Sequence, residues 1–117
     1  MTRVLAFGTF DLLHKGHKNF FKQAKKEGDE LVVVIALDAT VEEVKGRTPD
    51  WDEAIRKKEV GSVEEVDKVV LGNKGDKYDI IREVKPDIIA LGYDQSTFTH
   101  DLEAFAKEFN PKIKIIR

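Results

Sequence analysis

The sequence predicts an α/β domain built on a doubly wound sheet of about five parallel strands, with helices on both faces. Three observations lead to this prediction. Short apolar runs alternate with amphipathic stretches along the chain, the longest run shows no polar alternation, and prolines stand directly before two of the runs. Parallel strands read as continuous apolar runs because helices cover both sides of their sheet.

The first predicted unit is a strand, a loop, a helix and a second strand. Val4–Phe7 is a short apolar run that ends at a glycine, and Leu31–Leu37 is a longer run, LVVVIAL, too continuous for a strand with one face in water. Between them, His17–Glu27 places apolar side chains on one helical face and lysines around the rest, and Gly28 with Asp29 ends the helix. This order is typical of a parallel sheet.

The same alternation continues to the end of the chain. Pro86 and Pro111 each stand just before an expected strand, where proline ends a helix and favours extended backbone in the residue before it. The remaining predicted elements are, in order, helix Val41–Val44, helix Asp52–Val60 capped by Asp50 or Asp52, strand Asp67–Leu71, helix Tyr78–Val84, strand Asp87–Leu91, helix Leu102–Phe109 with Phe105 and Phe109 in the core, and strand Lys112–Ile116. A single Rossmann-like domain over residues 1–117 follows, and in such sheets ligands bind beyond the carboxyl ends of the strands, where the strand order reverses.

Composition excludes several classes of protein. The 117 residues contain no cysteine, which excludes disulfide frameworks, thiolate zinc sites and cysteine nucleophiles. A formal charge of -2 gives no overall attraction to nucleic acid or anionic lipid, and no apolar run approaches the roughly 18 residues of a membrane span. Met1–Arg3 leads into an apolar run without the features of a signal peptide. We therefore expect a cytoplasmic protein without nucleic-acid or membrane partners.

The loop after the first strand, GTFDLLHKGH, carries the clearest chemical signal. Gly8 lets the backbone approach a ligand, and the helix that begins near His17 directs its unsatisfied amides and positive dipole end to the same place. His14 and His17 add donors whose charge can change near neutral pH. The loop therefore predicts a site for a phosphate that gains negative charge during a reaction. Two alternatives stay open on the residues alone: ordinary loop or capping histidines, and a zinc or iron site without an obvious third ligand.

These residues resemble a known signature. His14–His17 is similar to the HxGH motif of the cytidylyltransferase-like nucleotidyltransferases, and it stands between the first strand and the first helix as that motif requires. The likeness covers nearly the whole chain, and the other residues that share the pattern are Lys45, Arg56, Val66, Asp67 and Leu91–Gln95. Within this superfamily the chain looks most similar to the archaeal FAD synthases, and next to the glycerol-3-phosphate cytidylyltransferases.

The resemblance implies a reaction and a set of residue roles. A nucleoside monophosphate passes from ATP or CTP, with Mg²⁺, to FMN or a small phosphorylated alcohol, and pyrophosphate is released. The acceptor phosphate attacks the α-phosphorus in line, so the protein mainly positions groups and stabilises charge. By resemblance the catalytic residues are His14, His17 and Arg56, the nucleotide-binding residues are Gly8, Thr9, Phe10, Asp11, Gly16, Lys45, Gly92, Tyr93, Asp94 and Gln95, and the acceptor-binding residues are Asp38, Arg47 and Trp51. No protein ligand is assigned to a metal.

Ordinary structural explanations exist for several of these residues. Arg56 alone would be a charge on a solvated helix face, and Lys45 and Arg47 would be surface charges. The segment Gly92–Gln95 would be a glycine-containing turn with a capping acid, and Asp38 a structural acid after the second strand. The sequence alone leaves each of these alternatives open beside the functional one.

Within the superfamily the resemblance favours FMN adenylyltransferase activity. The alternatives are a glycerol-3-phosphate cytidylyltransferase and, from a different class, a nucleotide-binding domain that does not catalyse. The superfamily normally continues past its last strand into a hydroxyl-rich segment that closes on the triphosphate, whereas this chain ends at Arg117, so we expect a pocket open on one side. We also expect a homodimer through the region beside the site, with Phe10, Leu12 or Trp51 exposed near its mouth.

Overall fold

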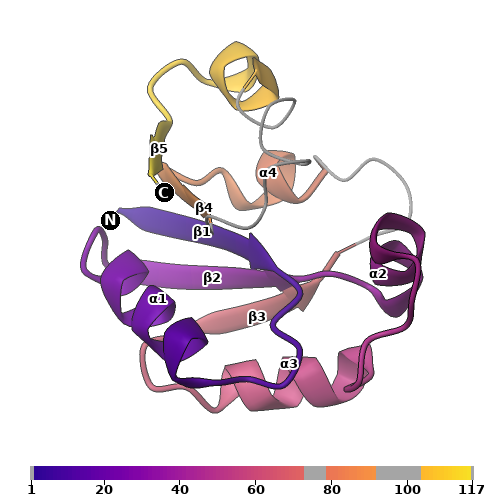
Figure 1. Cartoon of the computed structure of the whole chain (residues 1–117). Coiled ribbons are helices and arrows are strands. Elements are labelled where there is room, and N and C mark those ends of the chain that lie inside the picture. Colours follow the sequence, from indigo (N-terminus) through magenta and orange to yellow (C-terminus); the bar gives the residue numbers. More distant parts are fainter. Residues whose placement is uncertain (1, 73–78, 92–103, 117) are drawn as a thin grey trace.

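The computed structural model describes residues 2–72, 79–91 and 104–116 and confirms the predicted architecture. Within them, five parallel strands form one sheet in the order β3-β2-β1-β4-β5 (Figure 1). The strands are β1 (Arg3–Gly8), β2 (Glu30–Ile35), β3 (Lys68–Leu71), β4 (Ile88–Leu91) and β5 (Lys114–Ile116). Strand order reverses at β1, which pairs with β2 on one side and β4 on the other. The carboxyl end of β1 is therefore the place where a ligand is expected.

Helices connect the strands much as the sequence predicts. They are α1 (Lys15–Lys25), α2 (Asp38–Lys45), α3 (Glu53–Gly61) and α4 (Asp79–Val84), and residues 104–109 are also helical. The predicted cap of α3 is Asp52, whose carboxylate accepts the amide of Ile55 at 2.9 Å. The helix predicted in the place of α2 is too short, because α2 begins at Asp38. The prediction that Phe109 belongs to the core is wrong, since 37% of it is exposed.

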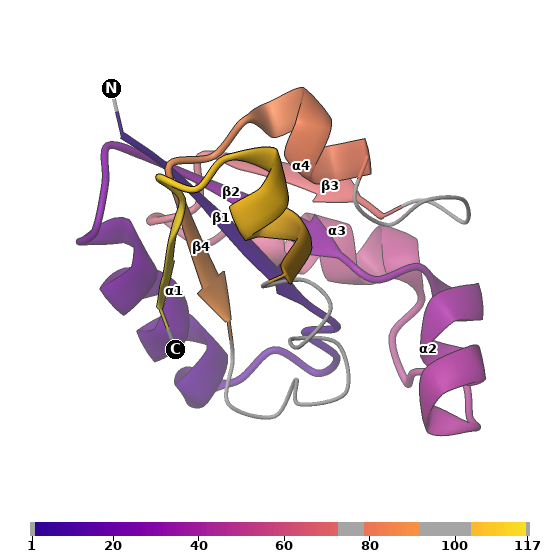
Figure 2. The ribbon, with the colours of Figure 1, turned by 90° about the horizontal axis from the view of Figure 1, so that it is seen from above.

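Two cores, one on each face of the sheet, hold the helices in place. Val4 of β1, Phe21 of α1 and Val60 of α3 belong to one apolar cluster, whereas Leu5 of β1 and Ile81 of α4 belong to the other. Successive strand residues point to opposite faces, so neighbouring side chains of β1 enter different cores. Figure 1 shows α1 and α3 on one face and α4 with residues 104–109 on the other. Figure 2 shows α2 beyond the carboxyl ends of the strands, outside both layers.

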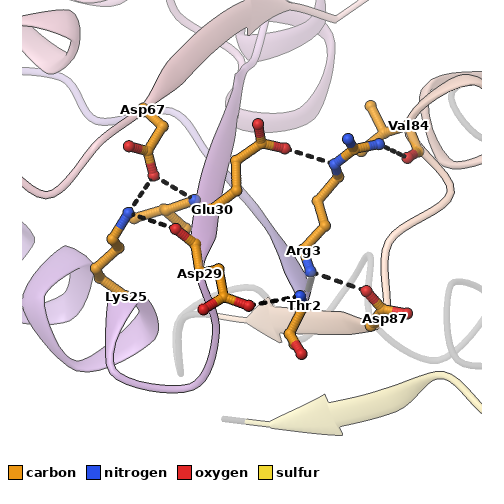
Figure 3. A network of polar contacts seen from close by, with 9 residues as sticks. Thr2, Arg3, Lys25, Asp29, Glu30, Asp67, Val84 and Asp87 are labelled. Atoms are coloured by element: carbon orange, nitrogen blue, oxygen red, sulfur yellow. Dashed lines mark hydrogen bonds and ion pairs between the residues drawn. The ribbon is translucent and has the colours of Figure 1, made fainter.

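A repeated pairing of aspartates with strand backbone secures the amino ends of the strands (Figure 3). In each pair the aspartate stands directly before a strand, its carboxylate accepts the amide of one residue at 2.7–2.8 Å, and its own amide donates to the carbonyl of that residue at 2.8–3.0 Å. The pairs are Asp29 with Thr2, Asp67 with Leu31 and Asp87 with Arg3. We call them the aspartate pairs. They satisfy strand amides that a staggered parallel sheet otherwise leaves without a partner.

Two cations join the aspartate pairs to neighbouring elements. Lys25 of α1 forms an ion pair with Asp67 and donates to the carbonyl of Asp29 at 2.9 Å. Arg3 donates to Glu30 at 2.5 Å and to the carbonyl of Val84 at 2.6 Å. The amino ends of the strands therefore form a continuous polar network that reaches both helix layers.

The pair formed by Asp67 and Leu31 predicts a specific loss of stability in acid. The hydrogen bond from Lys25 lowers the pKa of Asp67; burial opposes this shift, and the Leu31 amide adds to it, so the folded-state pKa lies below the ordinary value of 3.8. This carboxylate therefore contributes stability above the unfolded-state pKa, and the contribution is lost as the pH falls from about 4 through the folded pKa. We expect the urea midpoint of the wild type to fall more steeply between about pH 5 and pH 3 than that of Asp67→Asn.

The exposed Glu64 gives a matched control for this experiment. Glu64→Gln removes one carboxylate near α3 and is expected to leave the pH dependence of the urea midpoint close to that of the wild type. Equal pH slopes for Asp67→Asn and the wild type would show that Asp67 contributes nothing to acid sensitivity.

Candidate functional site

The loop between β1 and α1 lies at the carboxyl end of the central strand. Phe10 and Leu12 in this loop have left-handed backbone, with φ of 53° and 51°. The ring of Phe10 folds back into the core and is only 7% exposed, so the prediction that it is exposed near the mouth of the site is wrong. A Cβ on Gly8 would lie 2.5 Å from Cζ of that ring. The absence of a side chain at Gly8 therefore makes room for the Phe10 ring, and the close approach of Gly8 to a ligand stays a prediction.

His14 and His17 form a stacked pair at the start of α1. The Gly16 amide donates to Nδ1 of His14 at 3.0 Å, and the His14 amide donates to Nδ1 of His17 at 3.3 Å, so His14 caps the helix, as one of the alternatives predicted. The ring centroids are 3.8 Å apart and the planes differ by 19°. A Cβ on Gly16 would lie 2.9 Å from Cε1 of His14, so this glycine makes room for the histidine ring.

The capping bonds decide which ring nitrogen carries the proton. A backbone amide can only donate, so both Nδ1 atoms accept and hold a lone pair, and in the neutral ring the proton is on Nε2. The rings of Phe10 and His17 meet edge to face, with their centroids 5.5 Å apart, and this contact limits the orientation of the His17 ring. Two Nε2–H donors on nearly parallel rings at a helix N-terminus suit an anionic oxygen.

Arg56 of α3 is buried completely, with 0% of it exposed. Its Nε donates to the carbonyl of Trp51 at 3.0 Å, Nη1 to the carbonyl of Thr9 at 2.9 Å and Nη2 to the carboxylate of Asp38 at 2.6 Å. The alternative of a solvated helix face is therefore wrong for Arg56. Its guanidinium joins the β1–α1 loop, the start of α2 and the loop between α2 and α3.

Asp11 makes a second connection between the same loops. One carboxylate oxygen accepts the Asp50 amide and the other accepts the Trp51 amide, both at 2.8 Å. Burial raises the pKa of Asp11, but the two amides and the nearby Arg56 and Arg47 charges outweigh that effect and hold the pKa below its usual value. Asp11 is thus a carboxylate with both oxygens bonded to the α2–α3 loop.

Nothing in the sequence pointed to Glu53 as part of this region, and the structure leaves other predicted residues without a test. Glu53 accepts the Asp38 amide at 2.9 Å, but in sequence it only looks like an acid in the first turn of a helix. Arg47 is exposed in the α2–α3 loop, and Lys45 belongs to α2. The predicted nucleotide-binding segment Gly92–Gln95 lies outside the described residues.

The histidine and acidic side chains of the described residues were compared with the groups that hold metal ions. Residues 2–72, 79–91 and 104–116 contain no group of three or more histidine or acidic side chains that could hold a metal ion. In the same segments no helix is long and apolar enough to cross a membrane.

A hollow of about 390 Å³ lies between α3 and β3, and another of about 620 Å³ is lined by Arg82, Phe105, Glu108 and Phe109. Both hollows lie away from the histidine pair.

Comparisons with known proteins relate this chain to one family and to one solved structure. Residues 5–116 match the family model described as cytidylyltransferase-like. The whole chain is 47% identical to a FAD synthase from Aciduliprofundum boonei and 44% identical to one from Thermoplasma volcanium, covering 78% and 82% of those proteins. A crystal structure titled the lipopolysaccharide core biosynthesis protein from Thermoplasma volcanium superposes with a TM-score of 0.90 at 44% identity, over all of this chain and 95% of that one.

Proposed function

Because this chain belongs to the cytidylyltransferase-like family, we propose that it is a FAD synthase, a nucleotidyltransferase that joins the adenylyl group of ATP to FMN. Relatives named FAD synthase are 41–47% identical to it over 116 or 117 residues. The observation that carries the proposal within the structure is the stacked histidine pair at the N-terminus of α1.

The proposed reaction breaks one phosphorus–oxygen bond and makes another. An oxygen of the FMN phosphate attacks the α-phosphorus of ATP in line, and the bond from that phosphorus to the α–β bridging oxygen breaks. The electron pair leaves with pyrophosphate. Nε2–H of His14 and of His17 would donate to the α-phosphate and the bridging oxygen as negative charge grows there. No nucleophilic side chain takes part.

Mg²⁺ that ATP carries into the site would neutralise part of the negative charge of the triphosphate. We propose that Mg²⁺ arrives bound to phosphate oxygens of ATP, since Mg²⁺ commonly keeps substrate phosphates and waters as ligands. The exposed Arg47 and the nearby Lys45 are the proposed protein cations for the outer phosphates. Asp38 and Trp51 belong to the segment that follows β2, beside the β1–α1 loop. They are proposed to face the acceptor.

Other expectations stay predictions beside this proposal. A homodimer beside the site is supported by Leu12, which is 47% exposed in the β1–α1 loop, but no longer by the buried Phe10. A cytoplasmic location and the absence of nucleic-acid partners rest on composition alone. The binding of the base by Gly92–Gln95 rests on resemblance alone.

Pyrophosphate release measured with two substrate pairs tests the proposed function. We expect turnover with MgATP plus FMN, together with FAD in the product, and at least about tenfold less turnover with MgCTP plus glycerol 3-phosphate. The reverse preference would identify a glycerol-3-phosphate cytidylyltransferase. Nucleotide binding without turnover of either pair would identify a binding domain that does not catalyse.

A further inference from the structure

We propose that Asp11 and Arg56 are positioning residues that together hold the backbone of Trp51 and so fix the side of the site that receives the flavin acceptor. We call these two residues the Trp51 clamp. The acceptor part of this inference rests on the proposed function, whereas the clamp itself rests on contacts in the protein. Arg56 then acts by holding the loop, not by binding phosphate.

The clamp binds both the amide and the carbonyl of Trp51. The amide of Trp51 donates to Oδ1 of Asp11 at 2.8 Å, and its carbonyl accepts from Nε of Arg56 at 3.0 Å. The second oxygen of Asp11 accepts the amide of Asp50 at 2.8 Å. Hydrogen bonds to charged groups are stronger than those between neutral groups, so the α2–α3 loop is fixed where it passes the histidine loop.

The far ends of the clamp are anchored in other elements. Arg56 also donates to the carbonyl of Thr9 and to the carboxylate of Asp38, at 2.9 and 2.6 Å. A fully buried guanidinium is tolerated only when its donors are paired, so any shift of the loop leaves a costly unpaired charge. The lowered pKa of Asp11 extends the pH range of the ionised carboxylate, which accepts both amides, below that of an ordinary aspartate. The loop is therefore held by several bonds that are lost together.

The location of Trp51 assigns the clamp to the acceptor. The histidine pair follows β1, whereas α2 and the α2–α3 loop follow β2, on one side of the point where strand order reverses. In an in-line transfer the acceptor approaches the α-phosphorus opposite the leaving pyrophosphate, so the two substrates need separate sides of the site. The half-buried indole offers an aromatic surface that suits a flat aromatic ring such as the isoalloxazine of FMN.

Trp51 is the single tryptophan of the chain, so its fluorescence reports on the clamp directly. Asp11→Asn keeps the size of the side chain but leaves one oxygen to accept and turns an NH₂ group toward one of the two amides. We expect acrylamide to quench Trp51 about twofold more strongly in this variant, and the KM for FMN to rise about tenfold, with the KM for ATP within about twofold of wild type. Arg56→Lys keeps the charge but not the three-nitrogen fork, and is expected to act in the same direction.

Asp52→Asn is the matched control. It makes the same chemical change beside Trp51 in sequence, and asparagine caps helices as well as aspartate does, so quenching and both KM values are expected to stay at wild-type levels. Thermal unfolding of each protein identifies any variant that does not fold, in which case the other clamp variant decides.

Two results would overturn the proposal. Unchanged quenching of Trp51 in both clamp variants would show that Asp11 and Arg56 do not hold it. Parallel increases in the KM values for ATP and FMN would show that these residues do not act on the acceptor side. A wild-type protein that neither binds FMN nor forms FAD refutes the proposed function, and the quenching comparison on the free protein then decides the clamp alone.

Discussion

Replacing His17 by alanine is expected to lower kcat for FAD formation by about two to three orders of magnitude, while the Kd for ATP changes by less than about fivefold. The Nε2–H of His17 is proposed to donate to oxygens whose negative charge grows only during the transfer, so its loss acts mainly on the transition state. Single-turnover pyrophosphate release measures the first quantity, and titration calorimetry with MgATP and no acceptor measures the second.

Two further variants separate catalysis from structure at this position. Asn19→Ala changes an exposed residue of the same helix and is expected to leave kcat unchanged. His17→Gln restores an N–H donor on a side chain of similar reach and is expected to recover part of the lost rate. Wild-type kcat in His17→Ala would refute the catalytic role, and loss of its cooperative thermal transition would show that the histidine serves the fold instead.

The second large effect is expected from Gly8→Ala. The added Cβ would lie 2.5 Å from Cζ of the Phe10 ring, which is buried and has no room to withdraw without leaving the core. Overpacking of this kind costs about 1–3 kcal/mol of stability. Because the same ring contacts His17 edge to face, kcat is expected to fall as well, by about tenfold or more. Urea unfolding and steady-state kinetics on the same preparation measure both effects.

Gly61→Ala supplies the matched control, since a Cβ at that position meets only Cγ2 of Val69, at an ordinary 3.7 Å. Gly61 ends helix α3, where alanine is at least as favourable as glycine, so stability is expected to stay level or rise. In the double variant Gly8→Ala with Phe10→Leu, the shorter side chain lacks the ring atoms that clash, and part of the lost stability is expected to return. Additive losses in the double variant would rule out the Phe10 ring as the cause.

The fold was predictable because its signals are local. The run LVVVIAL is too continuous for a strand with one face in water, and the buried residues of β2 enter both cores as that pattern predicts. Asp52 marks the start of α3, because aspartate is a preferred N-cap residue and stands directly before a helical stretch. The start of α2 was missed because Leu37, at the N-cap position, makes no side-chain capping hydrogen bond and is not a residue type that marks the start of a helix.

The candidate site was predictable only where its chemistry lies in one segment. His14 and His17 stand three positions apart in sequence and at one helix end in space, so the loop could be identified. Arg56 looked like one charge among several on α3, and nothing in its neighbourhood predicts that it is buried against Thr9 and Asp38. Such contacts depend on how three loops meet at the edge of the sheet, which is a property of the tertiary structure.

The aspartate pairs have a consequence for how this protein can change. They anchor the amino edge of the sheet, whereas the candidate substrate contacts among the described residues lie at the opposite, carboxyl edge. Substitutions that redesign the loops for another acceptor therefore leave these anchors intact, and substitutions that strengthen the anchors leave the loops intact. Stability and specificity are then adjustable independently, by evolution or by protein engineering, from two ends of the same five strands.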